Sequence, residues 1–305
     1  MKRINRKHLT SIVGKTCDIG TGILVVACVL IFLPVCFSVY EYPKYVLIEF
    51  GICLLFAFRC FEFLLKKQLK IPYGSITIVV FCLVIPYTVS LIFSGFTVTA
   101  VSEYIHLLLY IIFFLTIATS RNTFFIQKSS INILVLCGAI VSLYGILQYL
   151  GIDIIHVKKQ FRPISTLGHV NYAAQFIVMV LPLAMISIWK NGKLAGKSFS
   201  AVSFFLMFIH LCITGSRGGY VAFAASFSIG CFFIWRASEI ELKTKMRTLY
   251  VGIVIVVLIV VGIVAIGRRY SKEPNRTVVS RAMSIFDVSQ KSTQFRLMTW
   301  KEQFI

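Results

Sequence analysis

Charged side chains are scarce in this sequence: Asp, Glu, Lys and Arg together make up only 14% of its 305 residues. A soluble domain carries about 25% charged residues, and hydrophobic residues here reach 58%. This composition excludes a soluble globular domain. It predicts a protein that crosses the lipid bilayer several times.

Paired cysteines are also missing, because none of the nine cysteines forms a C-x-x-C pair. Most of them fall within or at the edges of apolar runs, namely Cys28, Cys36, Cys53, Cys60, Cys82, Cys137, Cys212 and Cys231. We interpret them as small apolar packing residues rather than as metal ligands or disulfide partners. The sequence therefore predicts no metal site.

Long apolar runs are abundant, and a run of about 18 or more such residues can cross a bilayer as a helix. They predict spans at 19–39, 44–65, 71–93, 101–119, 131–150, 170–189, 198–213, 217–236 and 248–266. The seventh is the shortest and carries His210. We therefore predict an all-α fold, a polytopic transmembrane helix bundle of about nine spans.

Basic residues predict the orientation of these spans, since Lys and Arg accumulate in short cytoplasmic loops. Residues 1–18 are rich in Lys and Arg, and if they are cytoplasmic, every inner loop is basic while the first two outer loops are nearly free of positive charge. The predicted organisation is a basic cytoplasmic N-terminus (1–18), a transmembrane helical domain (19–266) and the start of a large outer loop (267–305).

The later outer segments depart from this charge pattern. Residues 151–170 and the residues after Ile266 are rich in basic side chains, and Arg217 lies at the same face between two apolar runs. Charged groups near the apolar zone of a bilayer are rare and usually meet an anion or a counter-charge. Together these features predict a site for a polyanion such as a lipid pyrophosphate or an acidic glycan. The alternative for each basic segment is a solvated loop.

The eighth span begins at Ser216-Arg217-Gly218-Gly219, so its N-terminus lies at the outer face. Helix N-termini bind phosphate, glycine lets a phosphate approach the backbone, and a guanidinium holds two oxygens at once. We predict that Ser216, Arg217 and Gly218 contact the anion. The alternative is that Arg217 snorkels to the interface while the glycines serve packing. Small residues spaced four apart also predict a packing face on this helix: Gly218, Ala222, Ser226 and Gly230.

The sixth span opens with the polar segment Arg162–Phe176. Asn171 and Gln175 are four residues apart and share a helical face, so we predict that both form hydrogen bonds with a sugar or a phosphate. The alternative is that Thr166 or Asn171 only caps the helix.

Two further side chains of this segment, Arg162 and His169, are predicted to bind the same substrate because they lie at the same outer mouth. His156 and His169 are the histidines of the outer face. Either is a candidate base for a hydroxyl group.

Together the two segments resemble the O-antigen ligase and O-antigen polymerase superfamily. The first reads R-P-x-S-T-L-G-H-x-N-Y-A-A and the second T-G-S-R-G-G. In that family the first motif usually reads closer to T-L-G-N-P-N-Y, so His169 and Val170 depart from it while Asn171 and Tyr172 match. The resemblance covers the chain from the fifth predicted span onward.

The resemblance implies a cofactor-free, metal-independent transfer of a glycan from an undecaprenyl-pyrophosphate donor to an acceptor hydroxyl, at the periplasmic face of the bacterial inner membrane. Arg217 matches the arginine of the family's S-R-G element, and Arg296 resembles a second arginine that opens an R-x-x-x-W stretch. The family assigns both to catalysis, and guanidinium groups do stabilise the charge of a departing pyrophosphate. The acceptor is the lipid A core or another acceptor for a ligase, or a second lipid-linked glycan for a polymerase, and both remain open.

A histidine segment resembling H-N-x-Y-L normally follows in the outer loop of that family. This chain ends at Ile305, before any such segment. We therefore interpret it as a truncated product or a fragment, and we do not expect it to be active alone.

A transporter of polysaccharides or solutes is the alternative class of function. Glu49, Arg59 and Glu62 in the second span are charges of the kind that mark ion pathways, although Arg59 and Glu62 also have the spacing of a local pair. Glu103 and His106 either join the outer cavity or cap their helix. Against a transporter, the sequence has no convincing internal repeat. Nucleic-acid binding is not expected despite the net charge of +20, because the membrane divides the basic residues between two faces.

Overall fold

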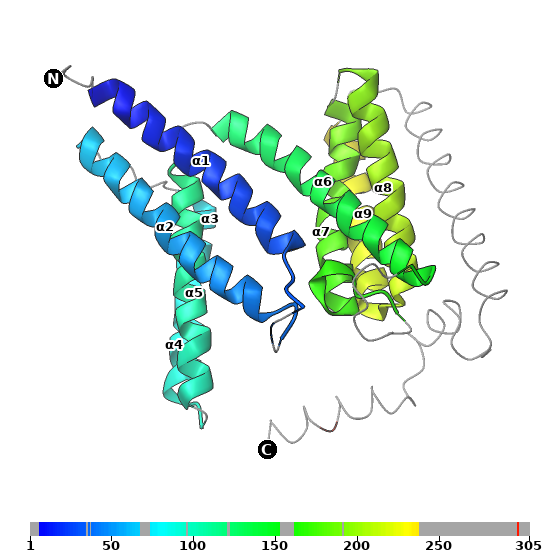
Figure 1. Cartoon of the computed structure of the whole chain (residues 1–305), viewed down its shortest axis with the longest axis horizontal. Helices are drawn as coiled ribbons and strands as arrows, with labels where there is room; N and C mark the ends of the chain where they lie inside the picture. Colours follow the sequence, from blue (N-terminus) through cyan, green and yellow to red (C-terminus); the bar gives the residue numbers. More distant parts are fainter. Residues whose placement is uncertain are drawn as a thin grey trace. The chain divides into compact units, whose positions relative to one another are not determined.

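The computed structural model describes residues 6–34, 36, 38–67, 74–95, 97–120, 123–152, 162–190, 192–237 and 298. Within these ranges the chain is all-helical, without a β-strand, as Figure 1 shows. The elements are α1 (Arg6–Leu30), α2 (Tyr42–Lys66), α3 (Ser75–Cys82), α4 (Val84–Ile92), α5 (Thr97–Ala118), α6 (Thr123–Tyr149), the 3-10 turn η1 (Ser165–Leu167), α7 (Val170–Lys190), α8 (Leu194–Thr214) and α9 (Arg217–Ala237).

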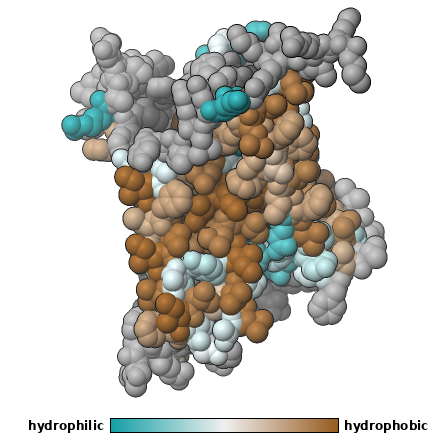
Figure 2. Space-filling model, turned by 90° about the vertical axis from the view of Figure 1, so that its left-hand side faces the viewer, coloured by the Kyte–Doolittle hydropathy of each residue, from teal (hydrophilic) through white to brown (hydrophobic). Residues whose placement is uncertain are grey.

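Six helical segments of the described chain are long and apolar enough to cross a membrane: His8–Leu30, Ser75–Ile92, Thr97–Ala118, Ser130–Tyr149, Val170–Ile188 and Leu194–Thr214. This identifies a membrane protein, and hydrophobic residues cover much of the face drawn in Figure 2. The predicted count of nine spans is not confirmed. The helices α2 and α9 match predicted spans in extent but are not among the six, and the predicted span 248–266 lies outside the described residues.

Several predicted helix boundaries differ in the structure, and one predicted span is broken; α6 begins at Thr123 and α8 at Leu194, before the predicted residues 131 and 198. The first helix covers residues 6–30 instead of 19–39, so most of the segment 1–18 continues the apolar helix. Its early end agrees with Pro34, because a proline disfavours helical backbone at the residue before it. The third predicted span is broken at Leu83 into α3 and α4. Pro86 explains this break, since its ring would clash with the carbonyl of Cys82, four residues earlier.

The chain divides into two compact units between Leu134 and Val135. In the first unit, α1 and α2 lie side by side (Figure 1), and α5 also contacts α2. Cys17 and Leu24 of α1 and Ile52 and Leu55 of α2 form its buried core. A β-carbon added at Gly20 would lie 2.8 Å from the side chain of Leu55, so a small residue permits this close helix packing.

In the second unit, α7 contacts both α8 and α9. Its core is formed by apolar residues that are nearly or fully buried: Val141, Ala173, Ala174, Ile177, Leu181, Met207 and Leu211. The predicted packing face of α9 is wrong. Gly218 and Ala222 are exposed, and no described atom lies within 4 Å of a β-carbon added at Gly218 or Gly230. Gly219, one residue further on, makes the close helix contact instead.

Candidate functional site

The connection between α8 and α9 is a short, internally bonded turn. Gly215 ends α8 with a left-handed backbone (φ 61°), and its N–H lies 3.4 Å from the carbonyl oxygen of Cys212. Ser216 precedes α9 and accepts a hydrogen bond at Oγ from the N–H of Gly219, at 3.4 Å, which is the arrangement of a helix N-cap. Tyr220 then donates from its hydroxyl to the carbonyl of Cys212 at 2.5 Å. These bonds tie the last turn of α8 to the first turn of α9.

Three contacts join this turn to the polar segment that opens α7. Arg162 donates from Nε to the carbonyl oxygen of Thr214 at 2.6 Å. Ser216 donates from Oγ to Oδ1 of Asn171 at 3.0 Å. A β-carbon added at Gly219 would lie 2.9 Å from the β-carbon of Ala174, so only glycine permits this approach without a shift. The structure thus brings the two sequence motifs together.

The loop before α7 is anchored to α6. Ser165 adopts a positive φ of 52°, donates from Oγ to the carbonyl of Val141 at 2.6 Å and donates its N–H to Oε1 of Gln148 at 2.8 Å. Gly168, with a φ of 76°, then reverses the chain into α7, a conformation that glycine adopts without strain. The start of α7 is therefore fixed by α6 on one side and by the α8–α9 turn on the other.

The cap of α7 is His169, not Thr166 or Asn171 as the sequence suggested. Nδ1 of His169 accepts the backbone N–H of Asn171 at 3.1 Å, and the carbonyl of His169 accepts the N–H of Ala173. Thr166 is buried in η1. The exposed imidazole of His169 lies against the ring of Tyr172, with 5.1 Å between centroids.

Arg217 and Gly218 are the first two residues of α9. Arg217 is half-buried, and Gly218 is exposed with open space where a β-carbon would be. As the first residues of an α-helix, neither has an intrahelical acceptor for its N–H. The backbone at Gly218 is therefore accessible at the start of α9.

The predicted site residues thus have different environments. Arg162, Ser216 and Asn171 make contacts within the protein that build the site, and Gln175 is exposed one turn further along α7. His169 is exposed but occupied at Nδ1. Arg296 and His156 lie outside the described residues.

The absence of acidic residues from one long stretch of the sequence is a signal that the predictions above did not use. Residues 154–238 contain no Asp or Glu, yet they contain these basic residues: Lys158, Lys159, Arg162, Lys190, Lys193, Lys197, Arg217 and Arg236. This whole stretch therefore has no carboxylate to neutralise Arg162 or Arg217. An anion that enters from outside would meet no repulsion from carboxylates of this stretch.

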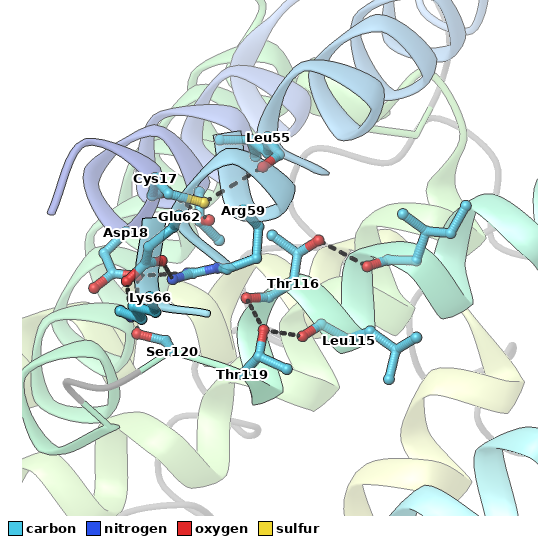
Figure 3. A network of polar contacts seen from close by, with 12 residues as sticks. Cys17, Asp18, Leu55, Arg59, Glu62, Lys66, Leu115, Thr116, Thr119 and Ser120 are labelled. Carbon is cyan, nitrogen blue, oxygen red and sulfur yellow. Dashed lines mark hydrogen bonds and ion pairs between the residues drawn. The ribbon is translucent and has the colours of Figure 1, made fainter. Parts of the chain in front are cut away.

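The charges of α2 belong to a separate network in the first unit, drawn in Figure 3. Arg59 donates from Nη1 to Glu62 at 2.6 Å and from Nη2 to Asp18 at 2.8 Å. Lys66 pairs with the other oxygen of Glu62, and Ser120 donates to Asp18 at 2.8 Å. The local pairing of Arg59 with Glu62 is confirmed. The sequence did not reveal that Asp18 and Ser120 join them.

His106 has a partner that neither sequence alternative anticipated. Its Nε2 lies 3.0 Å from Oε1 of Glu49, and its ring stacks on Tyr45 with 5.3 Å between centroids. The link therefore connects α5 to α2. His210 is fully buried in α8 against Gly145, and neither of its ring nitrogens has a hydrogen-bond partner among the described residues.

Within the described ranges, no group of His, Cys, Asp and Glu side chains is arranged to hold a metal ion. Comparison with protein-family models, with curated proteins and with solved structures gave no match to this chain.

Proposed function

We propose that this protein transfers a glycan from an undecaprenyl-pyrophosphate donor to an acceptor hydroxyl, in the manner of the O-antigen ligases that its motifs resemble. One observation carries the proposal. The polar segment that opens α7 and the S-R-G turn that opens α9 lie 52 residues apart in the sequence at Arg162 and Thr214, yet they are joined by direct hydrogen bonds. Two motifs that resemble those of one family therefore form one site.

The chemistry of this site suits a pyrophosphate. The N-terminus of α9 carries a positive partial charge, and Gly218 leaves its backbone accessible. Arg217 adds a planar guanidinium that can hold two phosphate oxygens. Its stretch of the chain contains no carboxylate that would compete with the phosphate for this guanidinium.

The same arrangement suits transfer as well as binding. When the glycan leaves its carrier, negative charge builds on the pyrophosphate, and donors held in place beforehand stabilise it without reorganisation. The bonds from Arg162 and Asn171 to the turn hold the start of α9 in place. Arg296 is the proposed second arginine and would act from the following outer loop.

The remaining features of the proposal follow from the family resemblance. The reaction takes place at the periplasmic face of the bacterial inner membrane; the N-terminus lies in the cytoplasm, as the basic inner loops predict. The acceptor is the lipid A core or another acceptor for a ligase and a second lipid-linked glycan for a polymerase.

The test is complementation, with the full-length gene, of a host that lacks its own surface-glycan transferase, with gels that separate surface glycan from lipid-linked glycan. Arg217→Ala is expected to lower transfer by about 100-fold or more, the usual effect of removing a preorganised donor. Arg217→Lys keeps the charge but not the planar fork, so it should restore only part of the activity. Expression of each variant in the membrane is measured alongside.

The matched control is Arg236→Ala, because Arg236 is exposed in the last turn of the same helix. It is expected to support normal surface glycan. Normal surface glycan from Arg217→Ala would reject the proposal and favour the transporter or a structural role. Equal loss from both variants would show that positive charge on α9 matters only for insertion.

A further inference from the structure

The hydrogen bond that caps α7 determines which ring nitrogen of His169 carries the proton. The N–H of Asn171 points at Nδ1 of His169 with 3.1 Å between the nitrogens. Because a backbone N–H only donates, Nδ1 must carry a lone pair and no proton. A neutral imidazole has one proton on its two nitrogens, so in His169 that proton lies on Nε2.

This tautomer excludes one role and favours another. A nitrogen that carries the proton of a neutral ring cannot accept a further proton, so Nε2 is not a general base while the cap is formed. It is a hydrogen-bond donor instead. The ring is exposed, and Nε2 lies on the side of the ring away from the capped backbone.

His169 is two residues from a direct contact with the start of α9. Asn171, two residues after His169, accepts the hydroxyl of Ser216, and Ser216 directly precedes Arg217. The first turns of α7 and α9 therefore meet at the contact between Asn171 and Ser216. His169 directly precedes this turn of α7. The nearby ring of Tyr172 restricts the orientation of the imidazole.

We propose that His169 is a substrate-binding donor whose Nε2–H contacts a pyrophosphate oxygen of the donor lipid, and that it is not the base of the reaction. This inference rests on the proposed function for the identity of the ligand. The tautomer itself follows from the hydrogen bond at Nδ1 and is independent of function.

Three substitutions of His169 distinguish the capping hydrogen bond at Nδ1 from hydrogen-bond donation by Nε2. Asparagine keeps only the cap, because its amide oxygen takes the place of Nδ1 while its NH₂ group takes that of Cδ2 and does not reach the position of Nε2. Aspartate keeps the cap but loses the donor and adds a negative charge. Alanine loses both. A purely structural role would leave the asparagine variant equal to the wild type, whereas a donor role would not; the aspartate variant adds the repulsion of its negative charge.

The first measurement is the nitrogen-15 NMR spectrum of the purified protein with labelled histidine, at about pH 8.5, where an unperturbed imidazole is neutral. The sequence has only five histidines, so the signal of His169 is identified by its loss in His169→Asn. The expected result is a proton on Nε2 and a bare Nδ1. A proton on Nδ1 would overturn the inference, whatever the function.

The second measurement is the affinity of the purified variants for inorganic pyrophosphate. His169→Ala is expected to bind at least about tenfold more weakly than wild type, since hydrogen bonds to charged groups contribute roughly 1.5–3 kcal/mol. His169→Asn, which keeps the cap but has no donor at the position of Nε2, should bind about as weakly as His169→Ala, and His169→Asp should bind more weakly still. Wild-type affinity in the asparagine variant would overturn the donor role.

Arg217→Ala separates this inference from the proposed function. If Arg217→Ala and the His169 variants all bind pyrophosphate as the wild type does, the phosphate site itself is rejected. If only Arg217→Ala loses binding, the phosphate site stands and the role of His169 is rejected.

Discussion

Arginine has opposite surroundings in the two units of this protein. In the first unit, Arg59 is 2% exposed and pairs with two carboxylates, Asp18 and Glu62. In the second, Arg162 donates to a backbone carbonyl, and Arg217 begins a helix in a stretch of chain without Asp or Glu. The comparison teaches that a buried charge neutralised by its own protein favours a structural role, whereas positive charge in a stretch of sequence without Asp or Glu favours binding of an outside anion.

The largest expected effect comes from removing the paired arginine. Arg59→Met leaves Asp18 and Glu62 with one cation fewer in a buried site, and breaking a buried ion pair on one side costs about 3–5 kcal/mol. Unfolding of the detergent-solubilised protein by heat or denaturant measures this loss. Arg217→Met, which leaves no carboxylate of its own stretch behind, should cost about 1 kcal/mol or less.

A triple variant tests the reason for that loss. Asp18→Asn and Glu62→Gln combined with Arg59→Met remove the unpaired carboxylates, so part of the stability should return. Equal losses for Arg59→Met and Arg217→Met would break the comparison between the two units.

An intermediate effect is expected at the contact between α7 and α9. Gly219→Ala places a methyl group 2.9 Å from the β-carbon of Ala174, and overpacking of this kind costs about 1–3 kcal/mol. The matched control is the neighbouring Gly218→Ala. Its methyl group enters open space, and alanine favours a helix over glycine, so its stability should be unchanged or slightly higher. Equal stability of both variants would argue against the close contact between the motifs.

The smallest effect is expected at Arg162. Arg162→Met and Arg162→Lys both lose the Nε donor to the carbonyl of Thr214, which should cost about 1 kcal/mol. Amide hydrogen exchange should therefore rise across the α8–α9 turn in both variants. Wild-type exchange in the lysine variant alone would mean that charge, and not the hydrogen bond, holds the turn.

Helix positions in the second unit were predictable because strong local signals mark their ends. The sequence placed the start of α7 at residue 170 and that of α9 at residue 217, where the structure begins both. Gly215 and Ser216 are typical of a helix end and of a helix start. The break at Leu83 could have been predicted too, because Pro86 lies inside the apolar run.

Contacts between residues far apart in the sequence could not be predicted from local sequence patterns. Nothing near Arg59 in the sequence points to Asp18, which is 41 residues away. The rotation of α9 could not be predicted either: four small residues suggested a packing face, but among the described residues no atom lies within 4 Å of a β-carbon added at Gly218 or Gly230. The two motifs were predicted to share one site, but their direct contact through Asn171 and Ser216 needed the folded chain.

Photo-crosslinking tests the central claim most directly, namely that the donor pyrophosphate binds where the two motifs meet. A polyprenyl pyrophosphate that carries a diazirine beside the phosphates is irradiated with the purified protein, and the labelled peptides are identified by mass spectrometry. The account predicts labelling near residues 162–176 and 214–220 that inorganic pyrophosphate competes away and that Arg217→Ala abolishes. Labelling around Arg59, or labelling that Arg217→Ala leaves unchanged, would contradict it.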